Sequence, residues 1–437
     1  MPVIIYKSAC KKTSFGKLHL LSLVGAVMMV SAMPYANAAP EPLVFDYKVP
    51  KQTNQIALVP FAGDTVISPM AAKVLNSDLK TTSQNLPEQP HTSREVASKL
   101  PLWQSTAIPY VVVGNTRMAG GDVVIDYEVV DTQTGRAIEG KQTLNSKRDA
   151  NSLRYAADVI ADNVRHLITG EPRDYAGRIA YIEESGTGAK KISRIKVMDA
   201  TGENEQTIAE VQGSIYSPAW SADGGRIAYV VQRDRSYPVI YVQSISGGAQ
   251  PITANLRGSN MSPSFSPDGG RILFSSSHEG EDYIYEMSTS GGAARRLTKG
   301  LQPSYAPDGQ SFAYVYDNGK NNQPRIYRYT FGSGSVQQVS KGGYATTPHF
   351  NKDGTQIAYL SGRSAAVMNS SGDNVASFGG MGLDEAPTFS PSGKRVVLAT
   401  KEGSKGTLTI KSLDGSNTVT KIGNGTIRSP VWSAPVK

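Results

Sequence analysis

Six copies of a short pattern recur along the C-terminal part of the chain and constrain its fold more than any other feature. Each copy has a proline, an aromatic residue two positions later and, in all but the last copy, a glycine four positions after the aromatic. The copies read SPAWSADG, SPSFSPDG, QPSYAPDG, TPHFNKDG, APTFSPSG and SPVWSAP, with prolines at 218, 263, 303, 348, 387 and 430. The steps of 39 to 45 residues between these prolines match the length of a four-stranded propeller blade.

The residue types within each copy predict a strand, a tight turn and a second strand. A Pro-Asp-Gly sequence favours a turn because proline fixes φ, aspartate accepts backbone N–H groups and glycine tolerates positive φ. The strand after the turn is rich in apolar residues, as in RIAYV from Arg226 and RILFS from Arg271. A third strand, a second turn and a fourth strand complete each repeat. The pattern therefore predicts an antiparallel all-β meander.

The last copy stops at Lys437, one strand into its repeat. Far upstream, GRIAYIEES from Gly177 has the second-strand pattern without a preceding first strand. A closed ring explains both halves, because the C-terminal strand would complete the sheet that begins near residue 177 and would leave no open strand edge at the join. We therefore predict a six-bladed β-propeller over residues 173–437; the alternative is an open β-array with a spare strand.

The first 38 residues have the three parts of a secretory signal peptide. Four lysines precede the apolar run Leu18–Val30, and Ala36-Asn37-Ala38 predicts cleavage after Ala38. The apolar run is short for a membrane span, and a retained anchor is the alternative. The sole cysteine, Cys10, lies within this segment, so the mature chain is predicted to contain no disulfide. We expect an exported, periplasmic protein.

Between the signal peptide and the repeats, the sequence predicts an extended tail and a small α/β domain with a mixed sheet. The tail, residues 39–54, contains three prolines and is either disordered or adds as a strand to another protein. The domain, residues 55–172, combines apolar strand patterns with about three helices. Its clearest helix is Asn151–Ile168, in which the residues that share one apolar face are Leu153, Ala157, Ile160, Val164 and Leu167.

We find no catalytic or metal-binding pattern in the mature chain. Its histidines, His91, His166, His278 and His349, are not at metal-ligand spacing. Neither GxSxG nor the phosphate-binding GxxxxGK[ST] occurs, and the recurring turn aspartates belong to separate blades. Because the 45 basic and 37 acidic residues are interspersed, nucleic-acid binding has little support. We expect no enzymatic activity, cofactor or metal.

The loops that precede the first strand of each blade are the candidate binding surface. In a propeller these loops gather on one face around the channel. Their mixture of apolar, hydroxyl, amide and charged side chains suits a protein partner better than a small molecule, although a merely solvated rim is the alternative. The candidate contact residues are Tyr216, Ser259, Asn260, Met261, Leu301, Gln302, Thr346, Thr347, Asp384, Glu385 and Arg428; we refer to them as the rim residues.

The order of signal peptide, α/β domain and SPxWSPDGxxIAY repeats resembles the TolB family of periplasmic Tol-Pal system proteins, along essentially the whole mature chain. The more specific matching pieces are VPF from Val59, VVVG from Val111, LRYAADVIADNVRHLITG from Leu153 and LDEAPTFSPSG from Leu383. Two features depart from the pattern. Ser392 stands where the turn usually has aspartate, and the loop before Gln302 is short.

The resemblance implies a monomeric, non-enzymatic adaptor that does not insert into the membrane. The rim residues would bind the peptidoglycan-associated lipoprotein Pal. The tail would bind the C-terminal domain of TolA by strand addition through Leu43, Val44, Phe45, Asp46 and Tyr47. With other Tol-Pal components, such a protein maintains the outer membrane and supports its constriction at cell division. The alternatives are a propeller hydrolase, for which no nucleophile elbow is present, and a carbohydrate or small-ligand binder.

Overall fold

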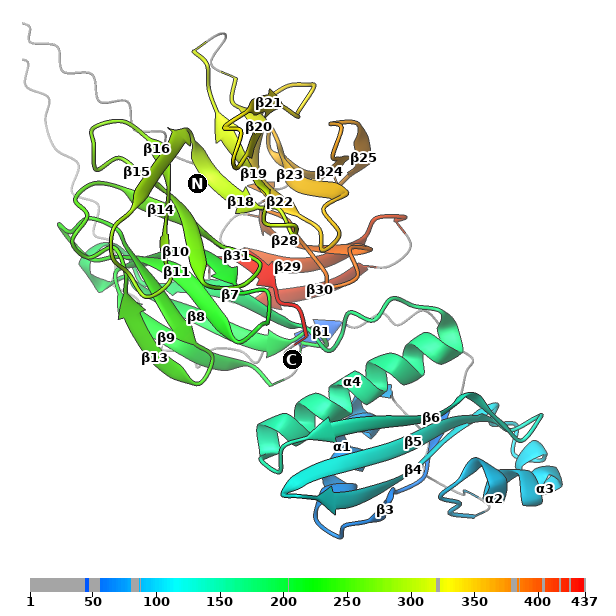
Figure 1. Cartoon of the computed structure of the whole chain (residues 1–437). Coiled ribbons are helices and arrows are strands. Elements are labelled where there is room, and N and C mark those ends of the chain that lie inside the picture. Colours follow the sequence, from blue (N-terminus) through cyan, green and yellow to red (C-terminus); the bar gives the residue numbers. More distant parts are fainter. Residues whose placement is uncertain are drawn as a thin grey trace, which may run out of the picture. The chain divides into compact units, whose positions relative to one another are not determined.

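A computed structural model describes residues 44–46, 56–79, 86, 88–202, 204–319, 323–378, 383–384, 386–402, 405–415, 418–423 and 426–435. Two architectures follow one another along these residues: a mixed sheet with helices, and then a series of antiparallel sheets (Figure 1). The predicted signal peptide and most of the tail lie outside the described residues. In the described part, no helix has the length and apolar character needed to cross a membrane.

The α/β domain contains a mixed sheet of order β2-β4-β5-β6, in which β3 also pairs with β4. β2 and β3 run parallel to β4, whereas β5 and β6 continue the sheet in antiparallel pairing. The strands are β2 (Ile56–Leu58), β3 (Ala62–Gly63), β4 (Tyr110–Ala119), β5 (Asp122–Asp131) and β6 (Arg136–Ser146), and the helices are α1 (Ile67–Leu79), α2 (Ser93–Ser98), α3 (Leu100–Gln104) and α4 (Ala150–Thr169).

Two apolar clusters cover the two faces of this sheet. α1 and α4 pack on one face, where Leu75 and Ile160 meet Ile125 of β5. α2 and α3 pack on the other face through Val96 and Trp103. The sequence predicted about three helices, and the described residues form four, because α2 ends at Ser98 and a new helix starts at Leu100 with Pro101 in its first turn. Of the face predicted for α4, Leu153, Ala157, Ile160 and Val164 are buried.

The sheets that follow are propeller-like and antiparallel, and most of them have four consecutive strands in sequential order. Between neighbouring sheets, the aromatic of a first strand packs against the previous sheet, as Phe265 packs against Val230 and Ile240. Four of these sheets have four consecutive strands each. The first comprises β10 (Ser214–Trp220), β11 (Arg226–Gln232), β12 (Val239–Ser244) and β13 (Gly247–Pro251), and the second comprises β14 (Asn260–Phe265), β15 (Arg271–Ser276), β16 (Tyr283–Ser288) and β17 (Arg295–Lys299). The third comprises β18 (Leu301–Tyr305), β19 (Ser311–Tyr316), β20 (Arg325–Thr330) and β21 (Val336–Gln338), and the fourth comprises β22 (Ala345–Phe350), β23 (Gln356–Ser361), β24 (Ser364–Asn369) and β25 (Asn374–Ser377).

Two further sheets combine segments that are distant in the sequence. One has the order β1-β30-β29-β28-β26, with β27 also paired to β28, and the other has the order β31-β7-β8-β9. Their strands are β1 (Val44–Asp46), β26 (Leu383–Asp384), β27 (Thr388–Phe389), β28 (Arg395–Glu402), β29 (Lys405–Ser412), β30 (Thr418–Gly423), β31 (Thr426–Trp432), β7 (Arg178–Ser185), β8 (Ile192–Asp199) and β9 (Gln206–Gln212). A short 3-10 helix, Gly188–Lys190, lies between β7 and β8.

The pairing of β31 with β7 confirms the predicted join between the two ends of the repeat array. Trp432 lies opposite Ile179. Ser433 N donates to Arg178 O at 2.8 Å, and Arg178 N donates to Ser433 Oγ at 2.9 Å. In an uninterrupted sheet, Ser221 forms the same two hydrogen bonds with Arg226 at 2.9 Å each. Two separate chain segments therefore reproduce the bonds that a single turn forms elsewhere.

Truncation of Trp432 tests the importance of this join. Trp432 is 5% exposed and packs against Ile179 and Val397. Loss of a buried tryptophan side chain costs about 3–5 kcal/mol, so Trp432→Ala should lower the free energy of unfolding by about that amount in urea titrations followed by circular dichroism. The control Val336→Ala, at a side chain that is 49% exposed, should change it by less than about 0.5 kcal/mol. Equal stability of the two variants would contradict a structural role for β31.

Candidate functional site

The rim residues lie on or directly beside the first strands of the sheets. The sequence placed them in the preceding loops, and this placement was wrong because strand pairing begins before the repeated proline, as the pairing of Tyr216 with Val230 shows. Their positions are Tyr216 in β10, Asn260 and Met261 in β14, Leu301 and Gln302 in β18, Thr346 and Thr347 in β22, Asp384 in β26 and Arg428 in β31, with Ser259 just before β14. Glu385 and the side chain of Asp384 lie outside the described residues.

Five first strands share an unusual backbone conformation at one position. The residue immediately before the proline is left-handed in each, with φ of 47° at Ser217, 53° at Ser262, 52° at Gln302, 53° at Thr347 and 51° at Ser429. The pairing register shifts at the same point in each strand. Left-handed backbone costs a residue with a Cβ about 1–2 kcal/mol. Bulges redirect side chains and such strain gathers at functional sites, so these bulges mark the candidate site.

Side-chain hydrogen bonds tie neighbouring first strands to one another. Gln302 of β18 accepts a hydrogen bond from Thr347 N of β22 at its Oε1, at 3.0 Å. Further ties of this kind include Tyr305 N to Ser264 Oγ at 3.0 Å, Trp220 Nε1 to Val431 O at 3.1 Å and Trp432 N to Thr388 Oγ1 at 3.2 Å. Because each tie satisfies a polar group on another strand, the arrangement of first strands is held in one geometry.

Arg428 forms the densest contacts among the rim residues. Its guanidinium lies 2.5 Å from Glu184 Oε1, also donates to Ile215 O, and has its carbon 4.8 Å from the centre of the Tyr216 ring. Lys191 contacts the same carboxylate at 2.8 Å. Burial alone would raise the pKa of Glu184, but hydrogen bonds and charge from Arg428 and Lys191 outweigh burial and lower it. The structure thus brings Arg428 and Tyr216 together, as it does Gln302 and Thr347.

Asn260 differs from the other rim residues because its side chain is fully buried. Its amide nitrogen donates to Pro238 O at 3.1 Å and to Leu256 O at 3.0 Å, and its oxygen accepts from Ser276 Oγ at 2.7 Å. It therefore fixes the segment that leads into β14. The neighbouring Ser259 is exposed, so the same segment presents one residue to solvent and anchors the next.

His349 is a polar residue of the first strands to which the sequence assigned no binding role. It lies in β22, and its Nδ1 atom is buried without a hydrogen-bond partner among the described residues. Burial lowers the pKa of His349 to about 4, so its ring is neutral at physiological pH. No group of three His, Cys, Asp or Glu residues that could hold a metal occurs in the described ranges. Only the tertiary structure shows that this Nδ1 atom is buried.

The tail residues that the structure describes form a strand. Val44–Asp46 is β1, which pairs antiparallel with β30, with Val44 opposite Ile422 and Asp46 opposite Thr420. Leu43 and Tyr47 lie outside the described residues. The tail thus has the backbone geometry that strand addition requires.

Comparison with known proteins matches this chain to one family. The family sequence model described as "TolB beta propeller domain" matches residues 166–436. The chain belongs to the TolB family. A curated relative from Bordetella pertussis, "Tol-Pal system protein TolB", is 30% identical over 392 residues, which cover 86% of this chain and 87% of the relative.

Two Acinetobacter proteins extend the TolB comparison. The "Tol-Pal system protein TolB" of Acinetobacter baylyi is 34% identical over 238 residues, and this alignment spans about half of each chain, 54%. The crystal structure of TolB from Acinetobacter baumannii matches with a TM-score of 0.69 and 33% identity, and it covers 90% of this chain and 99% of that one. The TolB fold thus extends to the α/β domain as well as the propeller-like sheets.

The pH dependence of stability tests the burial of His349. Since its pKa is near 4 in the folded state and about 6.5 in the unfolded state, protonation favours unfolding. Its contribution to stability is complete above pH 6.5 and is lost as the pH falls towards 4, by up to about 1.4 kcal/mol per unit. Urea titrations at pH 7.5 and pH 5 should therefore show a smaller acid-induced loss in His349→Gln than in the wild type. His91→Gln should retain the wild-type loss; an equal loss in all three proteins would refute the burial.

Proposed function

We propose that this chain is a periplasmic, non-enzymatic adaptor of the Tol-Pal system. The names and identities of its relatives support this role. We assign residues 1–38 to a cleaved signal peptide, 39–54 to the tail, 55–172 to the α/β domain and 173–437 to a six-bladed propeller. Support for a closed ring of six comes from the contacts between first strands, which run from β31 through β10, β14, β18, β22 and β27 back to β31.

The first strands and their rim residues form the proposed docking face for the lipoprotein Pal. The observation that carries this proposal is the repeated left-handed bulge, together with the ties that hold it. A surface that is already ordered loses less conformational entropy on binding. Partly exposed Met261 and Leu301 supply apolar area on this face, and partly exposed Tyr216 lies beside Arg428. Aromatic, methionine and arginine side chains are enriched in protein interfaces.

The tail is the proposed binding segment for the C-terminal domain of TolA. It is supported by β1, whose backbone pairs with an edge strand of this chain; the same hydrogen-bonding groups can pair with an edge strand of a partner. Through these two contacts the adaptor would link Pal to TolA, maintain outer-membrane integrity and support constriction during cell division.

Charge placed on the docking face should weaken Pal binding. Met261→Glu and Leu301→Glu each put a carboxylate where apolar contact is proposed, and we expect a loss of at least tenfold in affinity, about 1.4 kcal/mol, by calorimetric titration with Pal. Charge reversal at Asp384 and Glu385 tests the remaining rim in the same way. Val375→Glu, at a side chain 43% exposed on β25, is the matched control. Unchanged affinity in the rim variants would count against this face.

Removal of the tail should separate the two partners. A mature chain that lacks residues 39–51 should lose binding to the TolA domain while its affinity for Pal stays within about twofold, since β1 is not part of the first strands. Binding is compared by surface plasmon resonance with a chain that begins at residue 39. Retained TolA binding would refute the tail assignment, and turnover of a peptide or glycoside by the purified protein would refute the non-enzymatic role.

A further inference from the structure

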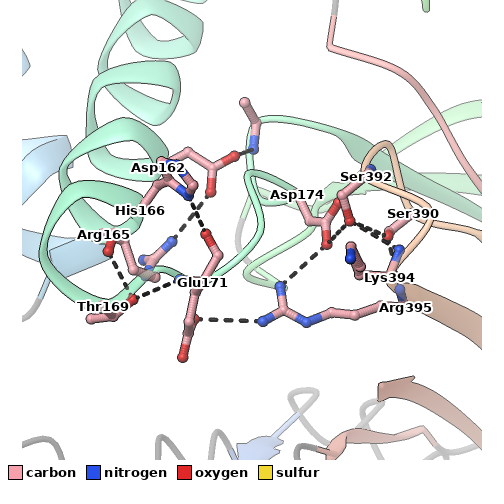
Figure 2. A network of polar contacts seen from close by, with 11 residues as sticks. Asp162, Arg165, His166, Thr169, Glu171, Asp174, Ser390, Ser392, Lys394 and Arg395 are labelled. Carbon is pink, nitrogen blue, oxygen red and sulfur yellow. Dashed lines mark hydrogen bonds and ion pairs between the residues drawn. The ribbon is translucent and has the colours of Figure 1, made fainter. Parts of the chain in front are cut away.

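The linker between α4 and β7 is bonded into the sheet of β26–β30 (Figure 2). Asp174, which is fully buried, accepts hydrogen bonds from Ser392 N at 2.8 Å, Ser392 Oγ at 2.9 Å and Arg395 NH1 at 3.3 Å. Ser392 Oγ accepts from Lys394 N at 3.1 Å, as turn aspartates accept from the corresponding backbone elsewhere. This explains why Ser392 departs from the repeat: an aspartate there would place a second carboxylate against Asp174.

The same linker is bonded to α4 on its other side. Asp162 Oδ2 accepts from Ala176 N at 3.2 Å. The ring of Tyr175 lies against two guanidinium groups, with its centre 4.3 Å from the Arg165 carbon and 5.2 Å from the Arg395 carbon. α4 belongs to the α/β domain, whereas Arg395 belongs to β28. The linker therefore holds a helix of one domain against a sheet of the other.

One turn earlier along α4, three aspartates from three elements come together. The side chain of Asp158 on α4 is hydrogen bonded to that of Asp78 on α1. Such a bond requires a proton, because an ionised carboxylate can only accept. Asp199 of β8 adds a further carboxylate, which accepts from Arg154 Nε at 3.2 Å and Arg154 NH2 at 3.0 Å. The charged groups that face Asp158 are thus Asp78, Asp199 and Arg154.

The protonation of these groups differs from that of carboxyls in water. Burial raises the pKa of Asp158 to about 9; the negative charges of Asp199 and Asp78 act in the same direction, and Arg154 opposes them. Burial also raises the pKa of Asp162 to about 6, against the hydrogen bond from Ala176 and the charge of Arg165. At neutral pH the assembled junction therefore carries a proton that a solvated aspartate, with a pKa near 3.9, would have released.

We propose that the contact between α4 and β8 is a proton-controlled latch between the α/β domain and the propeller-like sheets. Separation of the two elements would remove Asp199 and admit water to the Asp78–Asp158 pair, which would then lose its proton. Because docking takes up a proton, acidification strengthens the contact and rising pH weakens it. For one proton, the docking equilibrium constant changes about tenfold per pH unit. The orientation of the two domains thereby responds to the pH of their surroundings.

Hydrogen–deuterium exchange of the full mature chain tests this latch. The reporters are the amides of Ala176 and Ser392, which are bonded to Asp162 and Asp174 across the junction. After correction for intrinsic exchange rates, wild-type protection should fall about tenfold per pH unit between pH 6 and pH 8. Asp158→Asn keeps a donor for Asp78 without a titratable proton, so its protection should stay flat. The matched control Asp122→Asn, at a surface ion pair with Lys147, should keep the wild-type slope.

Two outcomes would overturn the latch: wild-type protection that is constant or rises with pH, or the same slope in Asp158→Asn as in the wild type. Circular dichroism confirms that each variant is folded. If Asp158→Asn does not fold, Asp158→Ser replaces it, because a serine hydroxyl can still donate to a carboxylate and does not titrate between pH 6 and pH 8. A wild-type slope in a folded Asp158→Ser variant would likewise overturn the proposal.

Discussion

The antiparallel pairing of β31 with β7 is the interaction on which the rest of the structure depends. It joins residues more than 240 positions apart, as the contact of Arg428 with Glu184 shows. No disulfide can contribute to this join, since the only cysteine is Cys10. Backbone pairing, the burial of Trp432 and the two hydrogen bonds between Ser433 and Arg178 hold the join instead. The first strands can contact one another in a cycle because this join exists.

The first strands combine backbone strain with a dense set of ties. Each left-handed residue before a proline is unfavourable in isolation, but it shifts the register so that neighbouring strands can exchange side-chain hydrogen bonds. Gln302 illustrates both properties: its own φ is 52°, and its side chain accepts from Thr347 N. A strained backbone conformation persists only where the surrounding contacts hold it in place. A face built in this way is ordered before any partner arrives, which is the property that our proposed docking role requires.

The hydrogen bonds around α4 couple the α/β domain to the propeller-like sheets. Its linker leads into β7, which pairs with β31 at the join, and Asp174 accepts hydrogen bonds from Ser392 in a turn of the neighbouring sheet. A change in domain orientation would therefore disturb the sheets next to the join. Burial of Asp158 and Asp162 is unfavourable for their charged forms. Because buried carboxyl groups do not by themselves stabilise the folded state, their presence at this junction fits the proposed role in the movement of the two domains.

The sequence by itself determined the repeat period, the turn chemistry, the pairing of the last strand with the segment after Gly177 and the buried face of α4. These features follow from local residue patterns and from one unfinished repeat. Only the tertiary structure decided that Asn260 is buried, that Arg428 forms an ion pair with Glu184, that Nδ1 of His349 is buried and that Asp174 complements Ser392. The reason is physical: a local pattern specifies a strand, but bulge position, register and contacts between residues hundreds of positions apart arise only when the sheets pack together.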